Sequence, residues 1–489
     1  MILKNAYVYN SDKEVFSIKN LWIKEHVIFD DSLQDHDFPE SEDVVDLSGY
    51  YLYPAIIDAH CHLLGTGKSS IGPNLDTIYE KDELIEVLRS CPSEFTILRG
   101  WDDSKLGFIP DKAFLDEFHP EGGLLLVRRC GHIGTINSKG IEALSIQELD
   151  GLDGTNLSTG ILQERALMKT SRKVKFTREQ EEKFFQNGAH EYLHNGITMI
   201  HSEDWNIHSF PKMIPFLQSQ QMIRLNEKVC IHSPEDFQKW VPLRQSLSNK
   251  NPFVNSNFVK FYLDGSLGAG TAYLNKPYAD HKKNRGVLFH TQEEMVELIQ
   301  FAEQVGTSVS VHIIGDLALE IALEAFSVSM TKGNPLRHKL IHVQLASSSQ
   351  LSRIRDMNLY VSIQPLFFES DIEMAPNKLG RRRFESIGYP FQKMHNLSIK
   401  ISFSSDSPIE TCNPFQTLSV SDKWFDRKTA FRYYTTGSAL SVFQENTMGS
   451  LSVGKWADGF LLKQDLFSLS GDQLKNVKPE RILFHGRFL

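Results

Sequence analysis

Hydrophobic and polar positions alternate at both ends of the chain. Residues 2–30 contain the segments ILKNAYVYN and FSIKNLWIKEHVIF, and residues 449–489 contain GSLSVGKWADGFLL and ERILFHGRFL. Alternation with a period of two is typical of strands that have one buried face. We therefore expect short strands from the two ends to pair in one β-rich domain.

The middle of the chain has a different pattern. Short, nearly continuous apolar runs rich in β-branched residues are separated by segments with apolar residues at three- and four-residue spacing, such as TQEEMVELIQFAEQVG. Continuous apolar runs indicate strands buried on both faces, and the segments between them indicate amphipathic helices. The eight runs are 53–58, 196–201, 223–232, 258–265, 308–316, 339–345, 359–365 and 399–406. Eight such strands alternating with helices predict a parallel (β/α)8 TIM barrel, whose chemistry lies at the C-terminal ends of the strands.

One connection in this pattern is far too long for a βα crossover. Residues 59–195 separate the first run from the second, whereas crossover loops usually span a few residues. The intervening segments FTILRGWDD and GGLLLVRRCGH are themselves apolar. We expect an inserted α/β subdomain at 68–190, after the first barrel strand.

Composition narrows the class of protein. The chain has 489 residues, of which 41% are hydrophobic and 23% are charged, as in an ordinary soluble globular protein. The net charge of −9 is not accompanied by a long basic run, so we expect a small-molecule substrate and neither a nucleic-acid nor a membrane partner. The five cysteines do not resemble a disulfide framework, and the first residues do not resemble a signal peptide. A cytoplasmic location is expected, and a homo-oligomer is left open.

A pair of histidines ends the first barrel strand. In the segment DAHCH, strand geometry places His60 and His62 on the same side and Cys61 on the other. An isolated H-x-H pair is more often ordinary surface or core histidine than a metal site. Two imidazoles on one side of a strand are nevertheless suited to chelating a divalent cation.

Other strand ends supply groups that fit the same chemistry. They are Lys260, His312, His342 and Asp406. Each has an ordinary explanation: the lysine extends its charged end to solvent or pairs with Asp264, the histidines are hydrogen-bonded core residues, and Asp406 caps a helix or turn. The coincidence on five strands favours a single site, and imidazoles with a carboxylate suit Zn²⁺ or a similar ion.

The order of these segments resembles that of a known family. DAHCH, KFYLDGS, VHIIGD, IHVQL and SSDSP follow one another as in the amidohydrolase superfamily, and most closely as in its amidohydrolase-3, or YtcJ-like, branch, which resembles N-substituted formamide deformylase. The resemblance extends over nearly the whole chain. It implies a TIM barrel over 53–446, and a β-sandwich domain formed by 1–52 and 447–489.

The resemblance also implies roles for the strand-end residues. His60, His62, His312 and His342 bind metal, and Lys260, carboxylated by CO₂, bridges two ions. A carbamate is an anionic ligand, which would explain a lysine in an apolar run. Asp406 binds metal, takes a proton from the activated water and passes it to the leaving nitrogen. Whether one or two ions bind is left open.

Four further residues are candidates for contacts with substrate: His132, Trp101, Glu164 and His201. His132 has the equal alternative of a hydrogen-bonded loop histidine, and Trp101 is more often a core residue. The branch often has an arginine where this chain has Gly270. A charged substrate contact is therefore expected to be missing.

These observations favour a metal-dependent hydrolase that cleaves a non-peptide C–N bond in an amide or an N-substituted formamide. Two alternatives stay open, because a fold and a metal site do not fix the substrate. One is a deaminase, a lactone or ester hydrolase, or an isomerase that uses the same site. The other is a catalytically silent barrel that binds a small molecule.

Overall fold

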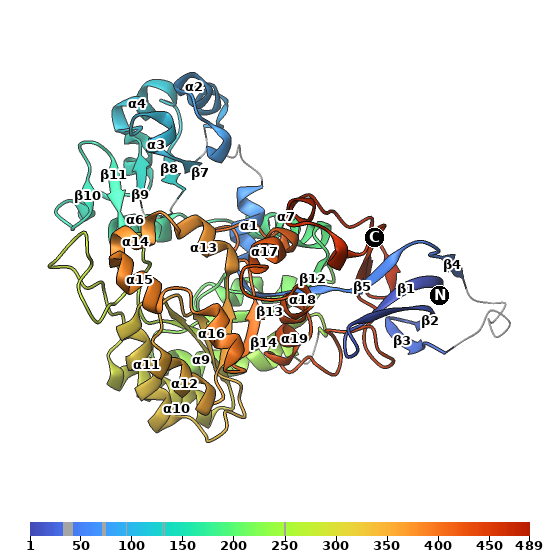
Figure 1. Ribbon diagram of the computed structural model, residues 1–489. Coiled ribbons are helices and arrows are strands. Elements are labelled where there is room, and N and C mark those ends of the chain that lie inside the picture. Colours follow the sequence, from blue (N-terminus) through green and yellow to red (C-terminus); the bar gives the residue numbers. More distant parts are fainter. Residues whose placement is uncertain (33–42, 71–74, 94, 130, 132, 249–250) are drawn as a thin grey trace. The chain divides into compact units, whose positions relative to one another are not determined.

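The computed structural model describes residues 1–32, 43–70, 75–93, 95–129, 131, 133–248 and 251–489 (Figure 1). The chain forms two compact units, Met1–Leu63 with Ala189–Leu489, and Leu64–Gly188. The predicted boundaries at 52, 68, 190 and 447 stay a prediction.

The first unit contains a barrel of parallel strands that follow one another in chain order. The strands are β6 (Ile56–Cys61), β12 (Ile197–Ser202), β13 (Arg224–Cys230), β14 (Val254–Tyr262), β15 (Ser308–Ile313), β16 (Lys339–His342), β17 (Tyr360–Ile363) and β18 (Lys400–Phe403). All seven neighbouring pairs are parallel. Each of the eight apolar runs of the sequence thus overlaps one strand of a TIM-like barrel. Residues 53 and 54 of the first run instead end β5, a strand of the terminal sheet.

Backbone hydrogen bonds join the two ends of this sheet. The N–H of Asp406 donates to the carbonyl of His60 at 2.9 Å, and the N–H of His62 donates to the carbonyl of Ser407 at 2.8 Å. These bonds lie just beyond β6 and β18. The first and last strands therefore meet at the C-terminal end of the barrel.

Helices between the strands bury an apolar stripe. They include α7 (Arg178–His194), α9 (Pro234–Ser248), α10 (Gln292–Gln304), α11 (Asp316–Ser329), α12 (Ser348–Asp356), α16 (Phe391–Asn396), α17 (Pro414–Ser421) and α18 (Arg427–Tyr434). Helix α10 starts with a capping box between Thr291 and Glu294, and it buries Met295, Leu298 and Ile299. In the part of the chain that the structure describes, no helix is long and apolar enough to span a bilayer.

Strands from both termini form one further sheet. It has the order β21–β20–β19–β5–β1–β2–β3, with β4 also paired to β1. The bounds are β1 (Ile2–Asn10), β2 (Val15–Lys24), β3 (Val27–Asp30), β4 (Val44–Asp46), β5 (Tyr51–Pro54), β19 (Gly459–Leu462), β20 (Arg481–Phe484) and β21 (Arg487–Phe488). The pairing of β19 with β5 joins the two ends of the chain, as the alternation predicts. The two layers of a β-sandwich stay a prediction.

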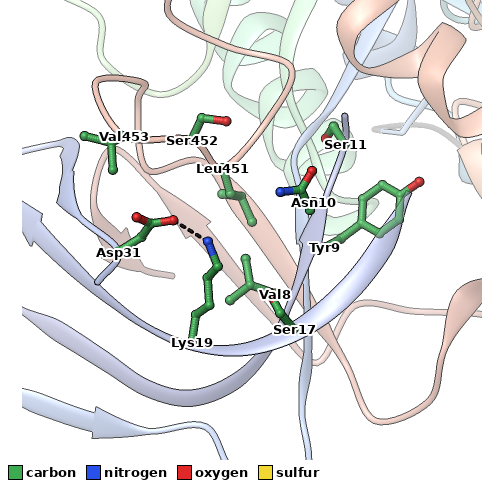
Figure 2. A pocket seen from close by; sticks show the side chains of 10 residues that line it. All are labelled: Val8, Tyr9, Asn10, Ser11, Ser17, Lys19, Asp31, Leu451, Ser452 and Val453. Atoms are coloured by element: carbon green, nitrogen blue, oxygen red, sulfur yellow. Dashed lines mark hydrogen bonds and ion pairs between the residues drawn. The ribbon is translucent and has the colours of Figure 1, made fainter. Parts of the chain in front are cut away.

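A hollow of about 350 Å³ lies on this sheet (Figure 2). Strands β1 and β2 and residues 451–453 line it, and Lys19 forms an ion pair with Asp31 at its edge. This Lys–Asp pair is partly exposed, and neither the histidines nor the other strand-end residues of the barrel line the hollow.

A buried ion pair fixes the start of β13 to the turn before β19. Nε of Arg224 lies 2.7 Å from Oδ2 of Asp458, and both side chains are almost completely buried. The guanidinium also lies 3.8 Å from the ring centroid of Trp456, a cation–π contact. Arg224 therefore links the barrel to the terminal sheet.

The second unit has mixed α/β structure. Its sheet has the order β10–β11–β9–β8–β7, formed by β7 (Thr96–Trp101), β8 (Leu124–Arg128), β9 (Ile133–Ile136), β10 (Thr155–Asn156) and β11 (Ile161–Gln163). Its helices include α2 (Lys81–Ser90), α4 (Lys112–Phe118) and α6 (Glu164–Lys173). Leu98, Leu115 and Leu126 lie in one of its core clusters.

Candidate metal centre

The two histidines of the DAHCH segment lie at the C-terminal end of β6. His60 is inside the strand and 1% exposed, whereas His62 follows the strand and is partly exposed. Nδ1 of His62 lies 2.8 Å from the backbone carbonyl of Glu203. A carbonyl accepts a proton, so this contact fixes the tautomer of the neutral ring and leaves Nε2 available as a ligand.

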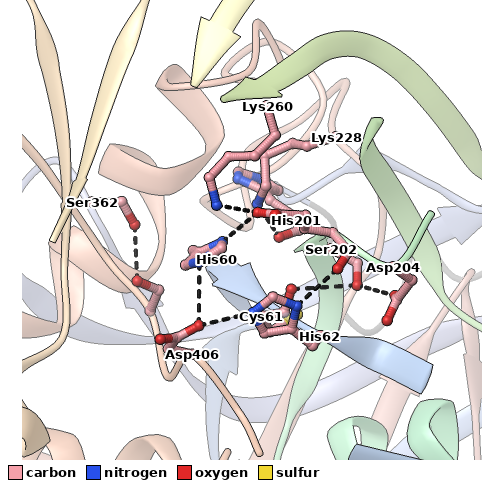
Figure 3. Close-up of polar contacts among 12 residues, drawn as sticks. His60, Cys61, His62, His201, Ser202, Asp204, Lys228, Lys260, Ser362 and Asp406 are labelled. Carbon is pink, nitrogen blue, oxygen red and sulfur yellow. Dashed lines mark hydrogen bonds and ion pairs between the residues drawn. The ribbon is translucent and has the colours of Figure 1, made fainter. Parts of the chain in front are cut away.

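Asp406 follows β18, the last strand of the barrel sheet, and its side chain faces both histidines. Its Oδ1 lies 3.2 Å from Nε2 of His60 and 3.2 Å from Nε2 of His62 (Figure 3). One ligand atom from each of the three residues lies within 4.8 Å of the other two. Asp406 has a φ of 58°, an uncommon conformation for a non-glycine residue, which often marks a functional position.

The ordinary pKa values of these groups are strongly altered. Burial lowers the pKa of His60 well below its usual value, and Lys228 and Lys260 lower it further. Burial alone would lower the pKa of His62, but the hydrogen bond and charge of Asp406 raise it to about 9. Burial alone would raise the pKa of Asp406, but the two histidines bring it well below its usual value. Near neutral pH, Asp406 is a carboxylate beside a protonated His62.

A buried carboxylate holds the backbone around this site. Asp58 accepts hydrogen bonds from the N–H of His60 at 3.2 Å and the N–H of Ser405 at 3.1 Å. It also accepts from the hydroxyl of Ser405 at 2.6 Å. Asp58 therefore fixes the main chain of β6 to the segment that carries Asp406.

The other two predicted histidines lie next to this group. The ring centroids of His342 and His60 are 5.5 Å apart, and those of His342 and His312 are 4.6 Å apart. Nδ1 of His342 lies 2.8 Å from Oε1 of Gln364, whereas Nε2 of His312 lies 3.1 Å from the carbonyl of Gly265. Burial lowers the pKa of His342 to about 4, so the ring is neutral and able to bind a metal.

Gln364 is one of the residues that the sequence interpretation missed. It lies after β17, and its amide nitrogen donates to the hydroxyl of Ser404 at 2.7 Å while its oxygen faces His342. This arrangement fixes the ring of His342. The apolar run before Gln364 predicted the strand but gave no sign of the partner.

Lys260 is buried at the end of β14 and forms an ion pair with Glu203. The hydroxyl of Tyr262 donates to the other oxygen of the same carboxylate. Glu203 was also missed, although it follows an apolar run just as the predicted residues do. Asp264, the alternative partner for Lys260, instead accepts from the N–H groups of Tyr273, Ile314 and Gly315. That sequence alternative is wrong.

The four predicted substrate contacts have different surroundings. His201 is completely buried at the end of β12, and its carbonyl accepts a hydrogen bond from Lys228. Trp101 is 1% exposed in the core of its own unit, where its indole N–H donates to the carbonyl of Leu126 at 3.2 Å. Glu164 begins α6, and its side chain lies outside the described part. His132 also lies outside the described residues. Contact with substrate stays a prediction for all four.

The donor set at the strand ends fits a divalent cation. Two imidazole nitrogens and a carboxylate oxygen converge, with neutral His342 beside them. Zn²⁺ commonly takes nitrogen and oxygen ligands of this kind, and catalytic sites leave one position open. Among the described residues, this is the only group of three or more His, Cys, Asp or Glu side chains whose ligand atoms all lie within 4.8 Å of one another.

A family model described as the amidohydrolase family matches residues 43–489. The chain belongs to the amidohydrolase family. The match includes all eight barrel strands and every residue of the candidate centre. The resemblance inferred from the order of the strand-end segments is therefore confirmed.

Relatives of this amidohydrolase-family chain align over most of its length. It is 26% identical to the putative amidohydrolase YtcJ of Bacillus subtilis, covering 92% of this chain and 91% of the relative. It is 21% identical to the N-substituted formamide deformylase of Arthrobacter pascens, covering 92% and 90%. A solved uncharacterized metal-dependent hydrolase from Pyrococcus horikoshii has the same fold, with a TM-score of 0.84, 24% identity and coverage of 96% and 99%.

Proposed function

We propose that this amidohydrolase-family protein is a metal-dependent hydrolase that cleaves a non-peptide C–N bond in an amide or an N-substituted formamide. The observation that carries the proposal is the convergence of Nε2 of His60, Nε2 of His62 and Oδ1 of Asp406. The similarity to an N-substituted formamide deformylase supports the choice of bond. The fold alone would not select it.

His60, His62 and Asp406 would hold the metal, and His342 would approach it through Nε2, since Gln364 engages its other nitrogen. The nitrogen-rich donor set favours zinc. A divalent ion supplies a Lewis acid that polarises a carbonyl oxygen and lowers the pKa of water to roughly 7. His312 lies one ring further away, beside His342.

Asp406 is suited to moving the proton. Its low pKa keeps it ionised near neutral pH, so it accepts a proton from the attacking water. It then donates this proton to the amide nitrogen as the C–N bond breaks and the amine leaves. The water oxygen stays on the acyl carbon in a carboxylic acid, which loses its remaining proton to solvent and becomes a carboxylate. Its backbone N–H donates to the carbonyl of His60, which fixes the residue beside the ligands.

The number of metal ions that the centre holds depends on the state of Lys260. The family resemblance predicts that a carboxylated Lys260 bridges two ions, with His312 and His342 on the second ion. A centre with one ion is the alternative, and in the structure the side chain of Lys260 contacts the carboxylate of Glu203. These two versions share the same chemistry at His60, His62 and Asp406.

The test combines metal analysis with a substrate panel. Purified protein is stripped with a chelator, reloaded with zinc, and assayed on N-alkyl and N-aryl formamides and on N-acyl amines. We expect zinc-dependent release of amine, and its loss in a His60→Ala, His62→Ala variant. If the protein binds zinc fully but turns over only lactones, esters or cyclic amidines, its function is one of those reactions and not C–N hydrolysis of amides or formamides. If the His60→Ala, His62→Ala variant binds small molecules and metal as well as the wild-type protein does, the result would favour a catalytically silent barrel.

A further inference from the structure

Strand β13 places a buried carboxyl group, that of Glu227, against the turn that follows β12. We propose that Glu227 is a positioning residue of the metal centre: it fixes the turn at residues 203–205, and this turn sets the tautomer and the orientation of His62. The inference rests on the proposed metal-dependent function, in which His62 is a ligand.

One oxygen of Glu227 holds two backbone N–H groups of this turn. Oε1 accepts a hydrogen bond from the N–H of Asp204 at 2.9 Å and another from the N–H of Trp205 at 3.3 Å. The carbonyl of Trp205 in turn accepts a hydrogen bond from the N–H of Cys230 at 3.0 Å. Buried backbone N–H groups need hydrogen-bond partners, so these contacts with β13 determine the path of the turn.

The turn holds His62 through its ring and through the backbone on either side. The carbonyl of Glu203 lies 2.8 Å from Nδ1 of His62. Before the histidine, the carbonyl of Cys61 accepts a hydrogen bond from the N–H of Glu203 at 3.0 Å. After it, the N–H of Leu63 donates to Oδ2 of Asp204 at 3.1 Å. A displacement of the turn would therefore disturb the ring and the main chain of His62 together.

The contact between Glu203 and His62 decides which ring nitrogen is free to bind a cation. A carbonyl only accepts, so Nδ1 must carry the proton, and Nε2 is left as the ligand atom on the side of Asp406. Without this carbonyl, the neutral ring can carry its proton on either nitrogen. Glu227 thus acts on His62 through the turn and does not itself touch the ion.

Two substitutions separate the hydrogen bonds of Glu227 from the volume of its side chain. Burial and the charge of Asp204 raise the pKa of Glu227 well above its usual value. Glutamine has nearly the shape of an uncharged glutamic acid, and its oxygen can accept the same two hydrogen bonds. Leucine also fills much of the space but offers no acceptor. Glu227→Leu is therefore the test variant, and Glu227→Gln is the conservative one.

Zinc affinity of the full-length protein is measured by competition with a chelator. We expect Glu227→Leu to weaken zinc binding by about 10- to 100-fold, the usual effect of losing a group that orients a ligand. Glu227→Gln should keep an affinity close to that of the wild-type protein. Unchanged affinity in Glu227→Leu would overturn the proposal. A loss in Glu227→Gln as large as in Glu227→Leu would also overturn it, because glutamine retains the acceptor.

The tautomer of His62 provides a readout that does not depend on whether Glu227→Leu folds. Zinc-loaded protein labelled with ¹⁵N-histidine is studied by long-range ¹H–¹⁵N correlation NMR, and the signals of His62 are identified by their loss in a His62→Gln variant. We expect a proton on Nδ1 and zinc on Nε2 in the wild-type protein and in Glu227→Gln. A second set of His62 signals is expected in Glu227→Leu. Zinc on Nδ1 of His62 in the wild-type protein would overturn the proposal.

Asn251→Leu is the matched control, because Asn251 is also buried and holds a turn, but at the N-terminal end of β14. Its side chain donates to the carbonyls of Leu217 and Gln220 at 2.7 Å each and accepts from the N–H of Phe253 at 2.9 Å. This variant should have lower thermal stability and unchanged zinc affinity. A loss of affinity equal to that of Glu227→Leu would assign the effect to general destabilisation and overturn the positioning role.

Failure of this inference is distinguishable from failure of the proposed function. A wild-type chain that binds no zinc would contradict the proposed function, and with it the ligand that Glu227 is inferred to position. Tight zinc binding that Glu227→Leu leaves unchanged would contradict the positioning role alone.

Discussion

Nε2 of His62 lies 3.2 Å from Oδ1 of Asp406, so a residue after the first barrel strand and a residue after the last form an ion pair. This contact raises the pKa of His62 to about 9. A metal binds only the neutral imidazole, so its uptake must release the proton of His62. The ion and the proton compete for the same nitrogen.

Zinc affinity should therefore increase with pH. Below the pKa of His62, each unit of pH should raise the apparent affinity by about tenfold, because one proton is displaced, and the increase should level off near pH 9. Competition with a chelator of known pH dependence measures this slope. His60 adds no competing proton in this range, since its pKa is far below its usual value. An affinity that does not change with pH would contradict the His62–Asp406 ion pair.

Replacing Gln364 should weaken the metal site without unfolding the barrel. In Gln364→Leu, Nδ1 of His342 loses its partner at 2.8 Å and the ring is free to rotate. We expect zinc affinity to fall by about 10- to 100-fold. Gln350→Leu is a suitable control, because Gln350 is also buried but caps α12. Equal affinity in the two variants would show that His342 needs no such support.

Asp406→Asn tests the proton transfer. The amide has nearly the same shape as the carboxylate but does not accept a proton, so we expect kcat on a formamide substrate to fall by at least about 10²- to 10⁴-fold. Zinc content is measured on the same samples, and kcat is expressed per bound zinc. A fall in zinc alone, with normal kcat per ion, would restrict Asp406 to holding the metal.

The buried pair of Arg224 and Asp458 should contribute to stability but not to chemistry. Asp458→Ala leaves a buried guanidinium without its carboxylate, which typically costs about 3–5 kcal/mol of unfolding free energy. Denaturant titration measures this loss, and the zinc content should stay unchanged. Replacing both residues by hydrophobic ones of similar size should cost less than the single change. A double variant as unstable as Asp458→Ala would contradict this account.

The sequence predicted the barrel because its strands are continuous apolar runs, a pattern that depends only on local composition. His60, His62 and Asp406 were identifiable because each ends such a run. Glu203 and Gln364 were not, although they also follow strands, because their roles depend on partners from other strands: Lys260 and His342. The layering of the terminal strands likewise depends on packing between distant segments.

Hydrogen bonds that join β6 to the segment after β18 have a consequence for biosynthesis. His60 and His62 leave the ribosome early, but Asp406 is among the last parts of the barrel to be made. The backbone contacts from Asp406 to His60 and from His62 to Ser407 form only when the eighth strand arrives. Since domains generally fold as units during synthesis, the nascent chain should acquire its tight metal affinity in one late step. A ribosome-bound chain that ends at residue 398 would carry the histidine pair but not the assembled centre.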